Sequence, residues 1–162
     1  MSGGSNRVLG IDAGTVETGY AIVDEETYRP LEAGIVSNTE MLDVIGKMHP
    51  GERVAIERFV SYGKPIGSTT IDAIEWTGRF IQAAEMMGLK WEYVTRREAR
   101  LYIADDIKAK DKDVRAGLIS RFGVVGTKKD QGFFYGFKDD MWSAFAIATT
   151  AIDRRKWIDN HR

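Results

Sequence analysis

One segment near the N-terminus sets the architecture of this chain: Arg7-Val-Leu-Gly-Ile-Asp12-Ala-Gly-Thr-Val-Glu-Thr-Gly-Tyr-Ala-Ile-Val-Asp24. It contains two apolar runs, Val8 to Ile11 and Tyr20 to Val23, which are separated by a small polar turn. Apolar runs of this length on either side of a turn predict a β-hairpin whose first strand is buried. The sheet of the protein is therefore expected to begin with this hairpin.

Asp12 stands at the end of the first apolar run. A lone carboxylate in such a place is costly unless a cation meets it, so one interpretation is a bound metal ion or a metal-bound phosphate. The other interpretation is that Asp12 caps the turn through its side-chain oxygen. The segment by itself leaves both interpretations open.

Length and composition describe an ordinary globular chain. Its 162 residues suit one domain, and 43% hydrophobic and 29% charged residues are typical of a packed fold. We expect a flexible tail at residues 1–6 and a single domain at residues 7–158. No apolar run approaches the roughly 18 residues of a membrane span, and no leader resembles a signal peptide, so a soluble cytoplasmic protein is expected.

The chain contains no cysteine. This excludes disulfides, thiolate zinc sites and cysteine nucleophiles, and it leaves carboxylates as the main groups that could bind a metal.

The formal net charge of −1 hides a gradient along the chain. Residues 1–94 sum to −6, residues 95–129 to +5 and residues 130–162 to zero. A concentrated basic region can hold a phosphate backbone even in a nearly neutral protein. A solvated helix face would produce the same pattern, so charge alone does not decide between them.

Periodicity and turn residues predict the remaining elements. Strands are expected at 31–37, 53–57 and 89–94, and helices at 39–48, 68–87, 95–103, 113–122 and 138–157. Thr39 is the expected cap of the first helix, and Thr95-Arg-Arg-Glu98 has the pattern of a capping box. The chain is therefore predicted to be α/β.

The strand at 53–57 repeats the pattern of the first strand, because its apolar run also ends in a carboxylate, Glu57. Strand ends in open α/β sheets meet at a common edge where ligands bind, so Asp12 and Glu57 predict one shared site. Asp139 and Asp140 open the last helix, where acids either favour the helix dipole or add further oxygen ligands. Together these carboxylates would suit Mg²⁺.

A late segment, residues 131–137, combines four aromatic residues with neighbouring lysines. Its rings could stack on bases while the lysines hold phosphates. They could equally form a strap over the hydrophobic core, and the sequence leaves both options open.

Four motifs occur together in one order. They are Gly10-Ile-Asp-Ala-Gly14, Val54-Ala-Ile-Glu57, Thr95-Arg96 before a basic linker, and Lys138-Asp-Asp140 with Ala144-Phe-Ala-Ile-Ala148. From about Val8 to Asp153 this ordered set resembles the RuvC family of Holliday-junction resolvases, in the RNase H-like superfamily. The resemblance implies a five-stranded mixed β-sheet flanked by α-helices. It also implies a homodimeric, Mg²⁺-dependent endonuclease acting on branched DNA, with Mn²⁺ as an alternative ion.

The resemblance assigns roles by position. Asp12 and Glu57 match the first two acids of the family, and Asp140 matches the third. The fourth acid falls on Ser143, so Asp139 is the substitute that we expect. Catalytic and metal-binding roles are thus placed on Asp12, Glu57, Asp139 and Asp140. Compact resolvases with a Lys-Asp-Asp opening also occur in phages and other viruses, which is compatible with a phage origin.

The resemblance also indicates where DNA would bind. By position, the basic residues of the family fall on the arginines of the helix expected at 95–103 and on the linker that follows this helix. An aromatic wedge of the family follows the second acid. The DNA-binding residues expected on this basis are Arg96, Arg97, Arg100, Lys110, Lys112, Phe59 and Tyr62.

The helix at 68–87 is the expected dimer interface. A chain with one acid cluster needs a second copy to make the two nicks that resolve a four-way junction. Trp76 and Phe80 lie off the main apolar line of this helix and are the expected interface residues. Ile71 and Ile74 are expected to pack within their own subunit, and Gly78 suggests a close backbone approach.

Two other functions fit parts of the sequence. Sugar-kinase and actin-like ATPases also place Asp-x-Gly-Thr after a strand, but they need a second phosphate loop and an adenosine motif that these 162 residues do not show. A catalytically inactive RNase H-like module that binds nucleic acid is the other alternative, since Ser143 replaces an acid. Cleavage of branched DNA with Mg²⁺, and ATP turnover, would separate the three.

Overall fold

The structure is a computed structural model that describes residues 6–162, so all of the expected tail except Asn6 lies outside the described part. Within that part the elements follow in this order: β1 (Arg7–Asp12), β2 (Glu17–Asp24), β3 (Pro30–Ser37), α1 (Asn38–Gly46), β4 (Arg53–Arg58), α2 (Ser68–Met86), β5 (Lys90–Thr95), α3 (Arg96–Ala104), α4 (Asp111–Phe122) and α5 (Asp140–Asn160). The last helix continues past residue 158, where we expected the domain to end.

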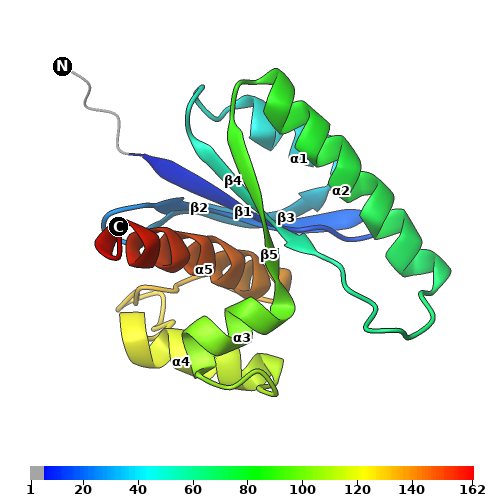
Figure 1. Cartoon of the computed structure of the whole chain (residues 1–162). Coiled ribbons are helices and arrows are strands. Elements are labelled where there is room, and N and C mark those ends of the chain that lie inside the picture. Colours follow the sequence, from blue (N-terminus) through cyan, green and yellow to red (C-terminus); the bar gives the residue numbers. More distant parts are fainter. Residues whose placement is uncertain (1–5) are drawn as a thin grey trace.

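The strands form one mixed sheet in the order β3-β2-β1-β4-β5. The predicted hairpin is confirmed, because β1 pairs with β2 in an antiparallel register and β2 pairs likewise with β3. β4 and β5 are added in parallel to β1. Figure 1 shows α1 and α2 on one face of the sheet and α5 on the other, with α3 and α4 beyond α5. None of the helices within residues 6–162 is long and apolar enough to cross a membrane.

Side chains of β1 alternate between two cores. Leu9 and Ile11 pack with the residues of α1 and α2, whereas Val8 packs with the residues of α5. Because successive side chains of a strand point to opposite faces, Asp12 follows Val8 and Gly10 onto the face that α5 covers. The alternation thus directs the first acid toward the start of the last helix.

Two glycines let α5 lie directly on the sheet. A Cβ added to Gly10 would stand 2.1 Å from the carbonyl oxygen of Ala144, and one added to Gly19 would stand 2.7 Å from the Cβ of Asp140. Both distances are shorter than real Cβ contacts, so only glycine fits. The close approach brings the N-terminus of α5 against the ends of β1 and β2.

Gly10→Ala is therefore expected to destabilise the protein by about 3 kcal/mol, because the new methyl group overlaps the backbone of α5. Gly78→Ala is the matched control, since nothing lies within 4 Å of a Cβ at this exposed helical position. It is expected to stabilise the protein by about 0.5–1 kcal/mol through helix propensity. Urea unfolding of both variants measures the difference, and equal stabilities would contradict this description of the packing.

The starts of α1, α4 and α5 differ from the prediction. The cap of α1 is Ser37, whose hydroxyl accepts a hydrogen bond from the Glu40 amide at 3.2 Å, and Thr39 lies inside the helix. α4 begins at Asp111 rather than at residue 113, and α5 begins at Asp140 rather than at residue 138. The capping box at Thr95 and Glu98 is confirmed.

The aromatic segment at 131–137 forms part of the core. Phe134 is fully buried, and its ring lies 5.0 Å from that of Phe145 and 4.8 Å from that of Trp142. Phe133 and Phe137 pack against the same cluster, and Tyr135 is exposed. The interpretation of this segment as a strap over the core is therefore confirmed. The three phenylalanines are not available to stack on bases.

The two faces of α2 are the reverse of our expectation. Phe80 is fully buried against the sheet and Trp76 is partly buried beside it, whereas Ile71 and Ile74 are 48% and 39% exposed. The prediction was wrong because the helix turns Phe80 and Ala84, one turn apart, toward β4 and β5. No part of the described chain approaches Gly78.

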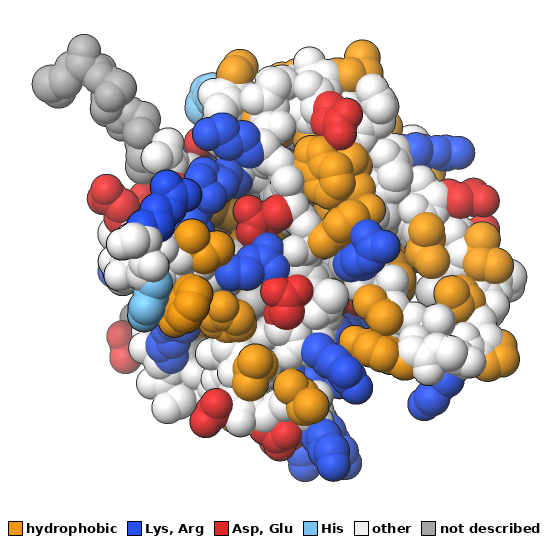
Figure 2. All heavy atoms as spheres, in the orientation of Figure 1, with side chains coloured by type: hydrophobic (Ala, Val, Ile, Leu, Met, Phe, Trp, Pro, Cys, Tyr) orange, Lys and Arg blue, Asp and Glu red, His pale blue; other side chains and the backbone are white. Residues whose placement is uncertain are grey.

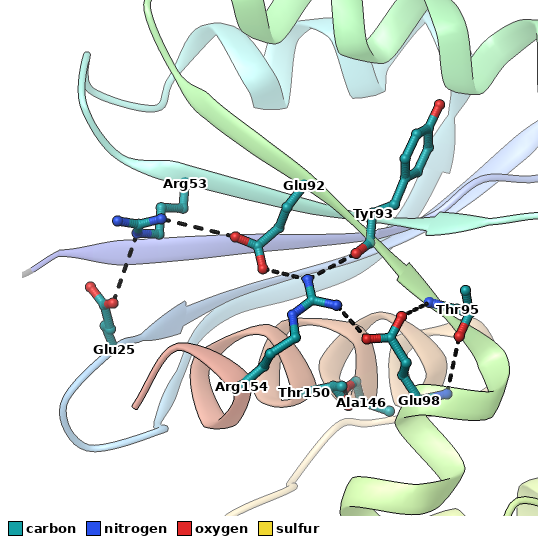
Figure 3. A network of polar contacts seen from close by, with 9 residues as sticks. All are labelled: Glu25, Arg53, Glu92, Tyr93, Thr95, Glu98, Ala146, Thr150 and Arg154. Atoms are coloured by element: carbon teal, nitrogen blue, oxygen red, sulfur yellow. Dashed lines mark hydrogen bonds and ion pairs between the residues drawn. The ribbon is translucent and has the colours of Figure 1, made fainter. Parts of the chain in front are cut away.

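A polar network joins the far end of α5 to α3 (Figure 3). Arg154 donates hydrogen bonds to Glu98, to Glu92 at 2.7 Å and to the carbonyl oxygen of Tyr93 at 2.9 Å. The other carboxylate oxygen of Glu98 accepts from the amide of Thr95 at 3.1 Å, at the start of α3. The first turn of α3 is thus held against the sheet by α5.

Candidate functional site

Asp12 and Glu57 stand side by side at the carboxyl ends of two parallel strands. Ile11 is in register with Ile56, so the next residues along β1 and β4 are neighbours. Ala55 packs on the α5 side of the sheet, and by alternation Glu57 points to the same side as Asp12. Glu57 is only 6% exposed, so its carboxylate is buried in the layer between the sheet and the helices.

The start of α5 adds a third acid. Asp12 is paired in register with Gly19, and it is Gly19 that the backbone of Asp140 touches. Asp140 therefore lies next to Asp12, and Ser143 follows one turn later. Asp139 precedes the helix with a φ of 48°, a left-handed value that non-glycine residues rarely adopt. Backbone strain is thus stored directly before Asp140.

Crowding of these acids changes the protonation of Asp12. Burial, together with the negative charges of Glu57 and Asp140, raises the pKa of Asp12 to about 7. Arg96 and hydrogen bonding from Ser143 act in the opposite direction. Asp139 and Asp140 are both exposed, and the charge of Asp140 is among those that raise this pKa, so Asp140 is grouped with Asp12 and Glu57. The role of Asp139 as a further ligand stays a prediction.

Glu57 is paired with an arginine. Nη2 of Arg96 donates to Oε1 of Glu57 at 3.3 Å. Burial raises the pKa of Glu57, and Arg96 and Arg100 lower it in part. Asp111 adds to the rise, which places a further acid near Glu57.

The donor set fits a hard divalent cation, although it is not assembled around one. Asp12, Glu57 and Asp140 offer only carboxylate oxygens, which Mg²⁺ prefers. The raised pKa of Asp12 shows that these acids lack sufficient positive charge nearby. Yet no three acidic or histidine side chains within residues 6–162 are close enough to hold one ion together. The chemistry of these side chains suits a divalent cation, and Arg96 contacts one of them.

A small pocket of about 70 Å³ opens between Glu57, α3, α4 and α5. Its wall includes Asp111, Arg115 and Ser143, in addition to arginines of α3. Asp111 and Arg115 were not predicted from the sequence to be site residues. The acidic first turn of α4 was a usable signal, but this segment resembled a polar connection, and only the packing of α4 against α3 shows that Asp111 faces Glu57.

A larger groove of about 620 Å³ begins at Glu57 and continues over the loop after β4. Basic and aromatic residues line it, namely Arg58, Phe59, Tyr62, Arg96, Arg97, Arg100 and Lys108. Figure 2 shows Lys and Arg side chains beside hydrophobic ones over α3 and the start of α4. Five of the expected DNA-binding residues thus share one groove, joined by Arg58 and Lys108, which were not expected.

Tyr62 is held at the tip of a tight turn. Tyr62 and Gly63 have φ values of 51° and 81°, and the amide of Lys64 donates to the carbonyl oxygen of Ser61 at 3.0 Å. The guanidinium of Arg97 lies 4.3 Å from the centre of the Tyr62 ring. The ring is 55% exposed and is therefore presented to solvent with one face covered by a cation.

The remaining basic residues are placed differently. Nε of Arg100 is fully buried and makes no hydrogen bond within the described residues. Lys110 and Lys112 are exposed on either side of Asp111 and line neither the pocket nor the groove. They stand at the edge of the site rather than within it.

Comparison with known proteins finds matches among solved structures. No protein-family model and no curated protein matches the chain. Thermus thermophilus RuvC superposes with a TM-score of 0.70 at 20% identity, over 93% of this chain and 96% of that one. The same protein in complex with a Holliday junction substrate gives 0.69 at 19% identity, over 93% and 96% of the two chains.

The yeast mitochondrial Holliday junction resolvase Ydc2 gives a TM-score of 0.65 at 14% identity, over 98% of this chain and 82% of that one. Similarity at these identities shows a shared fold. The chain therefore has the RNase H-like, α/β fold of the RuvC resolvases, as predicted, over nearly its whole length.

Proposed function

We propose that this protein is a structure-selective DNA endonuclease that resolves Holliday junctions by divalent-cation-dependent hydrolysis. One observation carries the proposal: the carboxylates of Asp12, Glu57 and Asp140 lie near one another, and Glu57 also lines a groove of arginines and aromatic rings. An acid cluster supplies phosphodiester chemistry, and the groove supplies affinity for a phosphate backbone. The similar folds of a RuvC bound to a junction and of a junction resolvase support the same substrate.

The residues divide into two tasks. Asp12, Glu57 and Asp140 would hold Mg²⁺, or Mn²⁺, which supplies an activated water and stabilises the charge of the departing oxygen. Arg96 and Arg100 stand between these acids and the groove, where their guanidinium groups can bind the phosphates on either side of the cut. The Tyr62 ring offers a stacking surface for an unpaired base at the branch point.

Synthetic four-way junctions, flaps and linear duplexes of matched sequence, incubated with Mg²⁺ and resolved on denaturing gels, test the proposal. We expect cleavage of four-way junctions and little cleavage of linear duplex. Equal cleavage of all three substrates would refute selectivity for structure.

An inactive nucleic-acid-binding module is the second candidate. Ser143 stands in place of an acid, and within residues 6–162 no three acids are close enough to share one ion. This candidate predicts junction binding without cleavage at any concentration of Mg²⁺ or Mn²⁺. The same gels, together with mobility shifts, therefore separate the two candidates.

Replacing both Arg97 and Arg100 by glutamine is expected to weaken junction binding equally for all sequences. Each lost phosphate contact removes about one unit from the slope of log affinity against log salt concentration, so the slope should fall by about 2. Arg79→Gln with Lys90→Gln is the matched control, since these residues do not line the groove. Fluorescence anisotropy over a salt series measures the slope, and an unchanged slope in the groove variant would show that these arginines do not contact phosphates.

We also infer that the protein acts as a homodimer through α2. Ile71 and Ile74 form an exposed apolar stripe on this helix. Ile71→Glu with Ile74→Glu should convert the dimer into a monomer in sedimentation-velocity experiments, because two buried charges oppose association. Leu31→Glu, at an exposed apolar residue of β3, is the control. A wild-type monomer at micromolar concentrations would refute the dimer.

A further inference from the structure

The Arg96 side chain is placed to reach two neighbouring cavities. It lines both the small pocket of acids and the adjacent groove, so its side chain stands on the boundary between them. Within the described residues its one hydrogen bond or ion pair with another side chain is the 3.3 Å contact with Glu57. Its remaining guanidinium nitrogens make no hydrogen bond within residues 6–162.

The two partners of this ion pair differ in burial. The Glu57 side chain is 7% exposed and that of Arg96 is 52% exposed. A buried carboxylate needs a positive partner, because an unpaired buried charge is strongly unfavourable, whereas a half-exposed guanidinium is well solvated without one. The ion pair therefore stabilises mainly Glu57. Arg96 loses little free energy when another cation takes its place beside Glu57.

Arg96 is the basic residue that pairs with the acid cluster, through Glu57. No other arginine or lysine forms an ion pair with Asp12, Glu57 or Asp140 in the described chain. A single guanidinium thus pairs with the carboxylate of Glu57, which a divalent cation bound to these acids would also contact.

The helix that carries Arg96 cannot move away with it. Thr95 and Glu98 close the capping box at the start of α3, and Arg154 ties Glu98 to α5 and β5 (Figure 3). A change of partner is therefore a rotation of the Arg96 side chain about a fixed backbone.

We propose that Arg96 is a built-in counter-ion of the acid cluster that competes with a divalent cation for Glu57, and that cation binding releases its guanidinium into the groove to bind a DNA phosphate. The proposal rests on the function proposed above and adds a coupling between its two ligands. Because coupling is reciprocal, DNA that holds Arg96 in the groove also raises the affinity of the acids for the cation.

Binding of Mn²⁺ to the DNA-free protein, followed by electron paramagnetic resonance at pH 8 and 0.15 M salt, tests the competition. Arg96→Gln is expected to bind Mn²⁺ at least about fivefold more tightly than the wild type. Arg96→Lys, which keeps the charge on a different head group, should lie between them. Arg97→Gln removes the same charge one residue away and should change the affinity less than twofold, since exposed charges are screened at this salt concentration.

A second measurement follows the release of Arg96. Ca²⁺ should strengthen junction binding by the wild type at least about fivefold in fluorescence anisotropy, and this gain should be lost in Arg96→Gln. Equal or weaker Mn²⁺ affinity in Arg96→Gln would overturn the competition, as would a full Ca²⁺ gain in that variant. If neither protein binds Mn²⁺ without DNA, the inference is also wrong, while the proposed function is judged separately by cleavage of junctions.

Discussion

Replacing Asp12, Glu57 or Asp140 by its amide is expected to slow junction cleavage at least about 10³-fold, while the Asp12 and Asp140 variants bind the junction within about threefold of the wild type in the absence of divalent cations. Each amide keeps the shape of the side chain but removes a charged oxygen ligand, and losing several kcal/mol of transition-state stabilisation has this effect on rate. Binding is retained because the groove, rather than the acids, supplies contacts to phosphate. Single-turnover cleavage and anisotropy measure the two quantities on the same junction.

Asp139→Asn is the control for this series. Asp139 adjoins Asp140 in the chain and is exposed like it, but it is the charge of Asp140 that raises the pKa of Asp12. Its cleavage rate should stay within about tenfold of the wild type. A rate for Asp140→Asn that equals the wild type, or a loss for Asp139→Asn as large as for Asp12→Asn, would reassign the third acid.

Asp12→Asn is also expected to stabilise the protein, by about 2–4 kcal/mol at pH 8 in the presence of a chelator. The pKa of Asp12 is raised from an ordinary value of 3.8 to about 7, and each unit corresponds to about 1.4 kcal/mol. Protonated Asp12 is therefore favoured by folding below pH 4, and that contribution is lost as the pH rises through about 7. Asparagine never ionises and escapes the loss.

Urea unfolding from pH 4 to pH 8 measures this effect. The stability difference between Asp12→Asn and the wild type should be small at pH 4 and grow toward pH 8. Asp43→Asn, on the exposed side of α1, removes a carboxylate without relieving burial and should show no such trend. A difference for Asp12→Asn that does not depend on pH would show that burial and the neighbouring acids do not disfavour the charged form of Asp12.

The architecture was largely predictable because local patterns and tertiary structure agree in it. The apolar runs around Asp12 and Glu57 are buried strands, and their parallel register brings the two acids together as expected. What the sequence did not reveal is why Asp140 joins them. That depends on contact between Gly19 and α5, which involves residues more than a hundred positions apart.

The errors concern which face of an element is covered. On α2, Phe80 and Ile71 are both apolar, and spacing cannot show which of them meets the sheet. Likewise, the phenylalanines at 133, 134 and 137 are buried because they meet Trp142 and Phe145 of α5, which their own segment does not indicate. Periodicity defines a stripe, and packing partners decide its direction.

At the candidate site, the charge gradient located the basic region but not the roles within it. Arg96, Arg97 and Arg100 are near neighbours on α3, yet one pairs with Glu57, one covers Tyr62 and one buries its Nε. These differences follow from the loop after β4 and from α4, both distant in sequence. Composition therefore predicted where the basic residues gather, and only the fold distinguishes their contacts.

Two copies of the acid cluster are proposed to resolve a junction by paired cuts. A supercoiled plasmid that extrudes a cruciform tests it most directly, because paired nicks across the four-way junction in one binding event yield linear DNA, whereas unpaired nicks yield a relaxed circle. With Mg²⁺ we predict linear product from the earliest time points, without prior accumulation of relaxed circles, and no product from Asp12→Asn. Relaxed circles alone, or an intact plasmid with the wild type, would contradict the account.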